Sequence, residues 1–168
     1  MRLRRLAVVL SPLAFAACLS GTDYSTNTYP NIPIEQTTFA PALNVDLTQS
    51  IRTSTGLYYR DLTVGTGATA TSTSAVNAYY VLYFANGQKV QELASPSTPL
   101  SFTLGQTPAQ VIPGWEEGLV GMKAGGTRQL IIPPALAYGA SGLVSPAGVL
   151  VIPPYAVLVY TVKLESIS

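Results

Sequence analysis

The stretch VIPGWEEGLVGMKAGG, residues 111–126, holds the only tryptophan of the chain, Trp115, directly after Gly114. Pro113 suits the first turn of a helix, and the two glutamates after the tryptophan suit the positive end of a helix dipole. We therefore predict a short helix over residues 113–122. An indole beside a glycine at the start of so short a helix is either a core residue or the floor of a pocket.

Strand patterns lie on both sides of this helix. Apolar and polar residues alternate, or aromatic and β-branched residues gather, over residues 56–67, 76–90, 100–105, 127–134 and 156–167. Asn86-Gly87 is a strong signal for a β-hairpin. The pattern predicts an α+β domain, with a mostly antiparallel sheet and one short helix.

The composition excludes several kinds of catalytic site. The chain of 168 residues has no histidine and a single cysteine, Cys18. A catalytic triad with histidine, a Cys–His pair and a zinc site of the usual ligands are therefore excluded, and no internal disulfide can form. Glu116 and Glu117 are neighbours on the predicted helix and point in different directions, so they do not form an acid–base pair. We expect neither a metal ion nor a cofactor.

Residues 1–18 have the order of a secretory signal peptide. Arg2, Arg4 and Arg5 precede an apolar run over residues 6–17 that is too short to span a bilayer. A buried strand or helix is the weaker interpretation, because all the charge lies on one side of the run. Removal of this segment leaves six basic against eight acidic residues. No basic patch remains, so nucleic acid is not expected as a partner.

Two cleavage sites compete at the end of this segment. Ala14–Ala16 suits an ordinary signal peptidase, whereas FAAC, residues 15–18, resembles a bacterial lipobox. We favour the second, because a lone cysteine at this place is otherwise unexplained. Cys18 would then carry lipid and become the mature N-terminus. This predicts an exported protein of the cell envelope or periplasm, anchored to a membrane through Cys18.

Residues 19–54 show no sustained period and are rich in Thr, Ser, Asn and Pro. This composition is typical of a tether, which would let a domain stand away from a surface. Phe39 and Leu43 could dock on the domain, and residues 44–54 could form one helical turn. We place the folded domain at residues 55–168.

One kind of catalysis needs none of the excluded groups. Rotation about the peptide bond before proline breaks no bond, and its barrier of about 18–20 kcal/mol comes from amide resonance. The carbonyl is less polar in the twisted transition state, so a dry aromatic bowl stabilises that state better than the planar amide. Trp115 would be the floor of such a bowl.

Three segments carry a resemblance to a known family. VIPGWEEGLVGMKAGGTRQLIIPPALAYGASG, residues 111–142, and VIPPYAVLVYTVKLESI, residues 151–167, closely resemble the FKBP-type peptidyl-prolyl cis-trans isomerases. GLYYRDLTVGTGATA, residues 56–70, resembles the first strand and turn of their secreted bacterial members. The resemblance covers about residues 55–168. It implies a half-wrapped antiparallel sheet of about five strands around one short α-helix, with a proline pocket between them.

The resemblance also implies the roles of individual residues. Trp115 matches the pocket floor, Tyr138 matches the tyrosine whose hydroxyl donates to a ligand carbonyl, and Tyr80 matches a wall tyrosine. Tyr160 occupies a wall position that is usually Phe. These four are the expected catalytic residues.

The expected substrate-binding residues are Val90, Gln91, Leu100, Val111, Ile112 and Ile152. The backbone of Val111 and Ile112 matches the part of the family that meets the bound peptide. Val90 and Gln91 stand where the family usually has Phe-Asp, and Leu100 replaces an aromatic residue. These departures predict a shallower pocket and reduced catalysis.

Two functions follow from the resemblance. The first is a peptidyl-prolyl isomerase that assists the folding of extracytoplasmic proteins. The alternative is a catalytically weak or inactive FKBP-like module that binds chains without turnover, in the manner of a chaperone. In both cases the partners are proline-containing polypeptides, and a monomer is expected.

Overall fold

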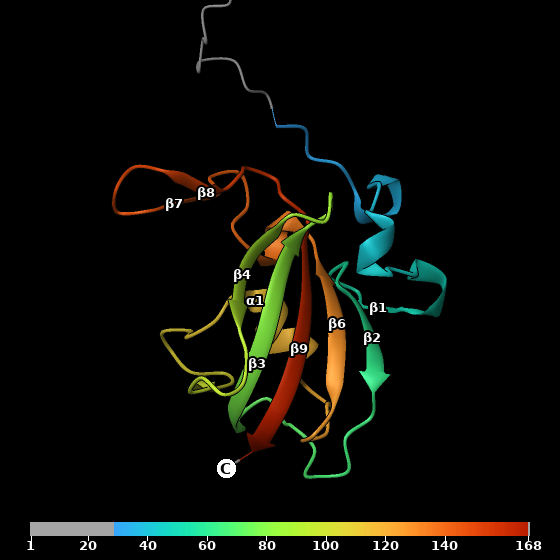
Figure 1. Cartoon of the computed structure of the whole chain (residues 1–168), viewed down its shortest axis with the longest axis vertical. Coiled ribbons are helices and arrows are strands. Elements are labelled where there is room, and N and C mark those ends of the chain that lie inside the picture. Colours follow the sequence, from blue (N-terminus) through green and yellow to red (C-terminus); the bar gives the residue numbers. More distant parts are fainter. Residues whose placement is uncertain (1–28, 168) are drawn as a thin grey trace, which may run out of the picture.

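An antiparallel sheet forms the body of the domain in the computed structural model, which describes residues 29–167 (Figure 1). The strands follow the order β1-β2-β6-β9-β3-β4, and β5 also pairs with β3. Their bounds are β1 (Ile51–Arg52), β2 (Tyr58–Thr63), β3 (Ala75–Phe84), β4 (Lys89–Leu93), β5 (Leu100–Thr103), β6 (Thr127–Ile132) and β9 (Leu158–Ile167). The predicted signal peptide and Cys18 lie outside the described residues.

The α+β class and the half-wrapped sheet around one short helix are confirmed, although the sheet has more strands than the expected five. The difference arises at two edges. β4 pairs with residues 80–83 of β3, and β5 pairs with residues 75–78, so the two share one edge of the same long strand. At the other edge the two-residue β1 extends the sheet beyond β2.

Helix α1 (Pro113–Gly118) lies across the inner face of the sheet and is shorter than the predicted 113–122. Two glycines let it approach β6 closely. A Cβ atom on Gly114 would lie 2.5 Å from Cγ2 of Ile132, and one on Gly118 would lie 2.8 Å from Cδ2 of Leu130. This explains why a glycine precedes Trp115: the backbone of the helix rests on the sheet, and the indole projects beside it.

Arg128 of β6 fastens the end of this helix to the sheet. Its guanidinium is almost fully buried and pairs with both carboxylate oxygens of Asp61, at 2.7 and 3.0 Å. The same group donates to the carbonyl oxygens of Gly118 and Val120, at 2.8 and 3.2 Å. The carbonyl of Gly118 at the end of the helix and that of Val120 just after it therefore accept from a charged donor, which forms a stronger hydrogen bond than a neutral one.

The residues before the sheet are a packed part of the domain. We call residues 34–52 the strap; it contains three short 3-10 helices, η1 (Ile34–Gln36), η2 (Pro41–Leu43) and η3 (Leu47–Gln49), and then β1. Ile34 and Leu43 are buried in a second apolar cluster on the outer face of the sheet. The side-chain amide of Gln129 donates to the Leu43 carbonyl at 2.8 Å. The folded region thus begins well before the predicted boundary at residue 55, and much of the predicted tether is strap.

Two further strands, β7 (Leu143–Val144) and β8 (Leu150–Ile152), form a separate hairpin that projects from one end of the domain (Figure 1). A last 3-10 helix, η4 (Pro134–Leu136), follows β6. Within residues 29–167, no helix combines the length and the apolar character needed to cross a membrane.

Candidate functional site

A pocket of about 290 Å³ opens between α1, the inner face of the sheet and the loop after β6. It is lined by Tyr80, Gln91, Leu100, Ala109, Gln110, Val111, Ile112, Trp115, Tyr138 and Tyr160. These residues come from β3, β4, β5, β9, the segment before α1, the helix itself and the turn after η4. Segments far apart in the sequence therefore contribute one side chain or a few each.

Strand register brings the two wall tyrosines of the sheet together. Tyr80 of β3 pairs with Val162, and Leu82 pairs with Tyr160 of β9, so the tyrosines are diagonal neighbours on the same inward face. Their ring centroids are 5.9 Å apart. Buried apolar residues flank the two tyrosines along both strands, and their packing holds the two rings in place.

Trp115 is both a core residue and the floor of the pocket. Its side chain is 3% exposed. The indole meets Tyr80 and Tyr160 edge to face, with centroids at 5.2 and 5.4 Å, and Phe102 at 5.6 Å. Edge-to-face packing of this kind stabilises aromatic pairs beyond their buried area. Three rings therefore fix the orientation of the indole, and what remains accessible of it faces the pocket.

Most of the residues expected in the site line this pocket. All four expected catalytic residues do so, and so do Gln91, Leu100, Val111 and Ile112 among those expected to bind substrate. The pocket also includes Ala109 and Gln110, which were not among the residues predicted from the sequence. Their position in the sequence, directly before the expected binding residue Val111, could have indicated that they lie in the pocket.

Val90 and Ile152 do not line the pocket. In the bulge of the β3–β4 ladder, Gln91 pairs with Leu82 and Lys89 pairs with Tyr83, so Val90 is the extra residue and packs against the core instead. Ile152 is buried in the main core, where it pairs with Leu143 at the base of the hairpin.

Three hydroxyl groups border the pocket, those of Tyr80, Tyr138 and Tyr160. No residue within 29–167 accepts a hydrogen bond from any of them, whereas the hydroxyl of Tyr58 on the outer face donates to Glu35 at 2.7 Å. Burial raises the pKa of the Tyr80 and Tyr138 hydroxyls. Burial, with smaller contributions from the Tyr138 and Tyr80 hydroxyls, raises the pKa of Tyr160 most strongly. All three stay protonated at neutral pH and are free to donate to a ligand.

The backbone around Tyr138 is held by hydrogen bonds on both sides. The amide of Gly139 donates to the carbonyl of Pro134 at 2.9 Å, and the amide of Gly142 donates to the carbonyl of Tyr138 at 3.1 Å. The amide of Tyr155 closes the loop onto Gly139 at 2.8 Å. The Tyr138 hydroxyl is therefore carried by a fixed turn at the rim of the pocket.

The site offers aromatic surface and hydrogen-bond donors, and the residues lining it include no carboxylate, amine or imidazole. Within residues 29–167, no group of His, Cys, Asp or Glu side chains could hold a metal ion. The arrangement suits a reaction that needs binding and desolvation and no proton transfer.

A reaction without proton transfer should show little pH dependence near neutral pH. A raised tyrosine pKa means that the donating hydroxyl form persists as pH rises and is lost only above about pH 10, the ordinary value for tyrosine. We expect kcat/KM for a proline peptide to be constant between about pH 6 and pH 9. A bell-shaped profile in that range would show that a titrating acid or base takes part.

Comparison with known proteins agrees with this geometry. The family model for FKBP-type peptidyl-prolyl cis-trans isomerases matches residues 67–165. This chain belongs to that family. An FK506-binding protein of Neisseria meningitidis serogroup B is 42% identical over 109 residues, which are 65% of this chain and 94% of the relative. A 46 kDa FK506-binding nuclear protein of Spodoptera frugiperda is 38% identical, over 67% of this chain and 26% of the relative.

Solved structures of FKBP-type isomerases share the fold. AtFKBP13 matches with a TM-score of 0.63 and 33% identity, over 71% of this chain and 98% of that one. A peptidyl-prolyl cis-trans isomerase of Pseudomonas syringae pv. tomato matches with a TM-score of 0.60 and 28% identity, over 71% of this chain and 81% of that one. The chain is thus an FKBP-type isomerase, and its reaction is rotation about the bond before proline.

Proposed function

We propose that this FKBP-type isomerase assists the folding of proteins outside the cytoplasm and that the aromatic pocket is where it stabilises the twisted X-Pro amide. The composition of the pocket supports the proposal that the twisted amide is stabilised there. Trp115 forms an apolar floor beneath two tyrosine walls, and the lining side chains include no carboxylate, amine or imidazole that could exchange a proton near neutral pH.

Different residues bind the proline ring of the substrate and hold its peptide chain. A proline ring placed on the indole of Trp115 is removed from water, and the carbonyl before it enters a less polar medium. Twisting the amide lowers the polarity of that carbonyl, so transfer to this medium favours the twisted state over the planar one. The Tyr138 hydroxyl donates to a neighbouring carbonyl and keeps the chain in register.

Replacing Tyr138 by phenylalanine tests this assignment, because it removes one oxygen and keeps the ring. A single hydrogen bond contributes about 0.5–1.5 kcal/mol, so kcat/KM should fall about 2- to 12-fold with no change in stability of similar size. Tyr83→Phe is the matched control, since Tyr83 packs under the strap on the outer face. Equal activities of the two variants would remove Tyr138 from the mechanism.

We propose further that the chain is exported and carries lipid on Cys18. The support is the sequence alone: an arginine-rich start, an apolar run over residues 6–17 and one cysteine directly after it. Mass spectrometry of the native protein should find a diacylated cysteine with an N-acyl chain as the first residue. An unmodified N-terminus at Ala17 would contradict the anchor and leave the isomerase assignment intact.

A further inference from the structure

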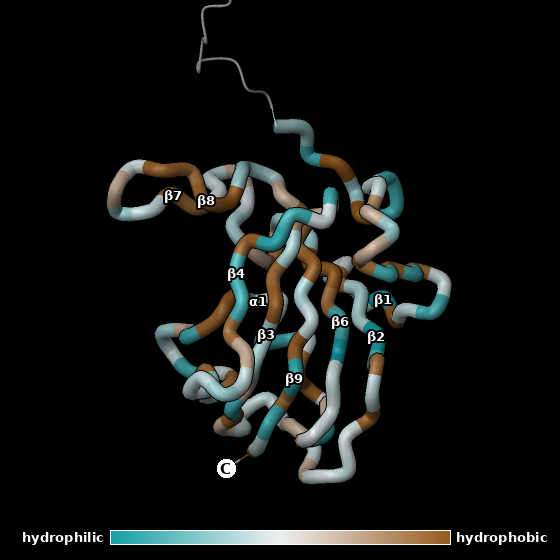
Figure 2. Tube along the Cα trace, viewed as in Figure 1, coloured by the Kyte–Doolittle hydropathy of each residue, from teal (hydrophilic) through white to brown (hydrophobic). Residues whose placement is uncertain are grey.

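The β7–β8 hairpin presents an apolar surface that no part of the described chain covers. Five of its side chains are 37–61% exposed: Leu143, Val144, Val149, Leu150 and Val151. In Figure 2 both strands of this hairpin are coloured as hydrophobic, and a paler tip joins them at the end of the projection. A contiguous exposed patch of large apolar residues on a domain of this size usually marks a site of interaction.

The surroundings of this surface are free of charge. Residues 129–162, which include the whole hairpin and its two flanks, contain no Asp, Glu, Lys or Arg. The polar groups of the tip are also largely satisfied. The amides of Ser145 and Gly148 donate to the carbonyls of Val149 and Ser145, at 2.8 and 2.9 Å, and the Val149 amide donates to the Ser145 hydroxyl at 3.1 Å. The absence of charge and these hydrogen bonds lower the free-energy cost of moving the hairpin into a less polar medium.

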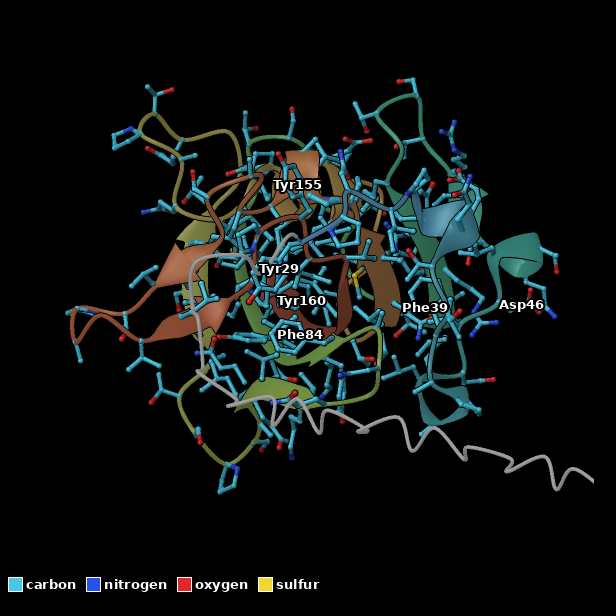
Figure 3. The ribbon with its side chains drawn as sticks, turned by 90° about the horizontal axis from the view of Figure 1, so that it is seen from above. Tyr29, Phe39, Asp46, Phe84, Tyr155 and Tyr160 are labelled. Carbon is cyan, nitrogen blue, oxygen red and sulfur yellow. The ribbon has the colours of Figure 1, made fainter. Side chains whose placement is uncertain are left out.

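The position of the hairpin indicates which medium that is. The described chain begins at the same end of the domain as the hairpin, and the C-terminus lies at the opposite end (Figure 1). Figure 3 looks down on this end, with the labelled Tyr29 over the body of the domain and the hairpin projecting beside it. Between Cys18 and Tyr29 there are ten residues, 19–28, which can span at most about 35 Å. A lipid on Cys18 would keep this end of the domain next to the bilayer.

We propose that the β7–β8 hairpin rests on the bilayer that holds Cys18, with the side chains of Val144, Val149 and Leu150 in the membrane interface. This rests on the lipid anchor proposed above. The hairpin joins the pocket through the pairing of Leu143 with Ile152 and through the amide of Gly142, which donates to Tyr138. Contact with the bilayer therefore holds the proline pocket close to the membrane surface, within reach of clients that are still near it.

A fluorescence experiment on vesicles tests the contact. The chain from residue 18 onward, with Cys18→Ser and an N-terminal histidine tag, is captured on phosphatidylcholine vesicles that contain a nickel-chelating lipid and a nitroxide-labelled lipid. Since Cys18 is the only cysteine, Val149→Cys provides a single dye site on the hairpin. Thr66→Cys provides a matched site on the exposed β2–β3 loop at the opposite end.

We expect the nitroxide to reduce emission from the Val149→Cys dye at least twofold and to leave the Thr66→Cys dye unchanged. Raising the salt concentration should not reverse the effect, because the contact is apolar. Adding Val144→Glu to the Val149→Cys chain should abolish the quenching. Equal quenching at the two sites, no quenching at either, or no effect of Val144→Glu would overturn the proposal.

Two features of the experiment separate the membrane contact from the lipid anchor and from the isomerase activity proposed above. The tag replaces the native anchor, so the quenching is measured whether or not Cys18 is lipidated in the cell. Isomerisation of a short X-Pro peptide by the captured chain reports on the pocket alone. If an unfolded polypeptide shifts the Val149→Cys emission in solution while vesicles do not quench it, the hairpin is a client-binding surface and the membrane contact is refuted.

Discussion

Replacing Trp115 with alanine is expected to abolish isomerase activity and to lower the free energy of unfolding by about 3–5 kcal/mol. The indole is almost fully buried and meets three aromatic rings, so its truncation leaves a cavity at the centre of the domain. This loss is a large part of the roughly 5–15 kcal/mol that stabilises a typical domain. Isomerisation of a short X-Pro peptide measures the loss of activity, and urea unfolding measures the loss of stability.

Trp115→Phe separates the two effects, because it keeps an aromatic ring on the floor and removes less volume. We expect this variant to remain folded and to retain part of the activity. A Trp115→Ala chain that unfolds at the same urea concentration as the wild type, with unchanged kcat/KM, would show that the indole is neither the floor nor part of the core.

Replacing Ile34 with alanine is expected to destabilise the domain by about 2–5 kcal/mol and to leave kcat/KM unchanged. Ile34 is 3% exposed between the strap and the sheet, on the face opposite the pocket. The matched control is Ile32→Ala, two residues earlier, where the side chain is 40% exposed and the expected change is within about 0.5 kcal/mol. If both variants unfold at the wild-type urea concentration, the strap is not part of the folded core.

Residues with a clear local signal were predictable from the sequence. Asn86-Gly87 marks the turn of the β3–β4 hairpin, where Gly87 has a φ of 87°. The proline and glycines around Trp115 mark a short helix against a sheet. The alternation in residues 156–167 places Tyr160 on the inward face of β9, where the structure has it.

The strap was predicted only in part, as docking of Phe39 and Leu43 and one helical turn, and the projecting hairpin was not predicted. The buried residues of the strap lie on three separate 3-10 helices, so their spacing follows neither the helical nor the strand period. The strands of the hairpin have two and three residues and surround a Ser-Pro-Ala-Gly turn, which reads as a loop. Tertiary packing, and not the local sequence, determines the conformation of both segments.

Of the two expected site residues that do not line the pocket, Val90 was displaced by a bulge. A bulge moves the side chains on one side of it to the other face of the strand, and local sequence does not show where it occurs. In β4 it puts Gln91 into the pocket and turns Val90 away from it. Gln91→Asp alone, without a change at Val90, is therefore the substitution that would restore the residue usual in the family.

The most direct test of the account is NMR exchange between the cis and trans forms of a short X-Pro peptide in the presence of the chain from residue 18 onward. We predict an exchange rate that rises linearly with protein concentration for the wild type and for Ile34→Ala corrected for its folded fraction. The rate should return to the buffer value in Trp115→Ala. A wild-type chain that leaves the exchange rate at its buffer value would contradict the claim that this pocket stabilises the twisted amide.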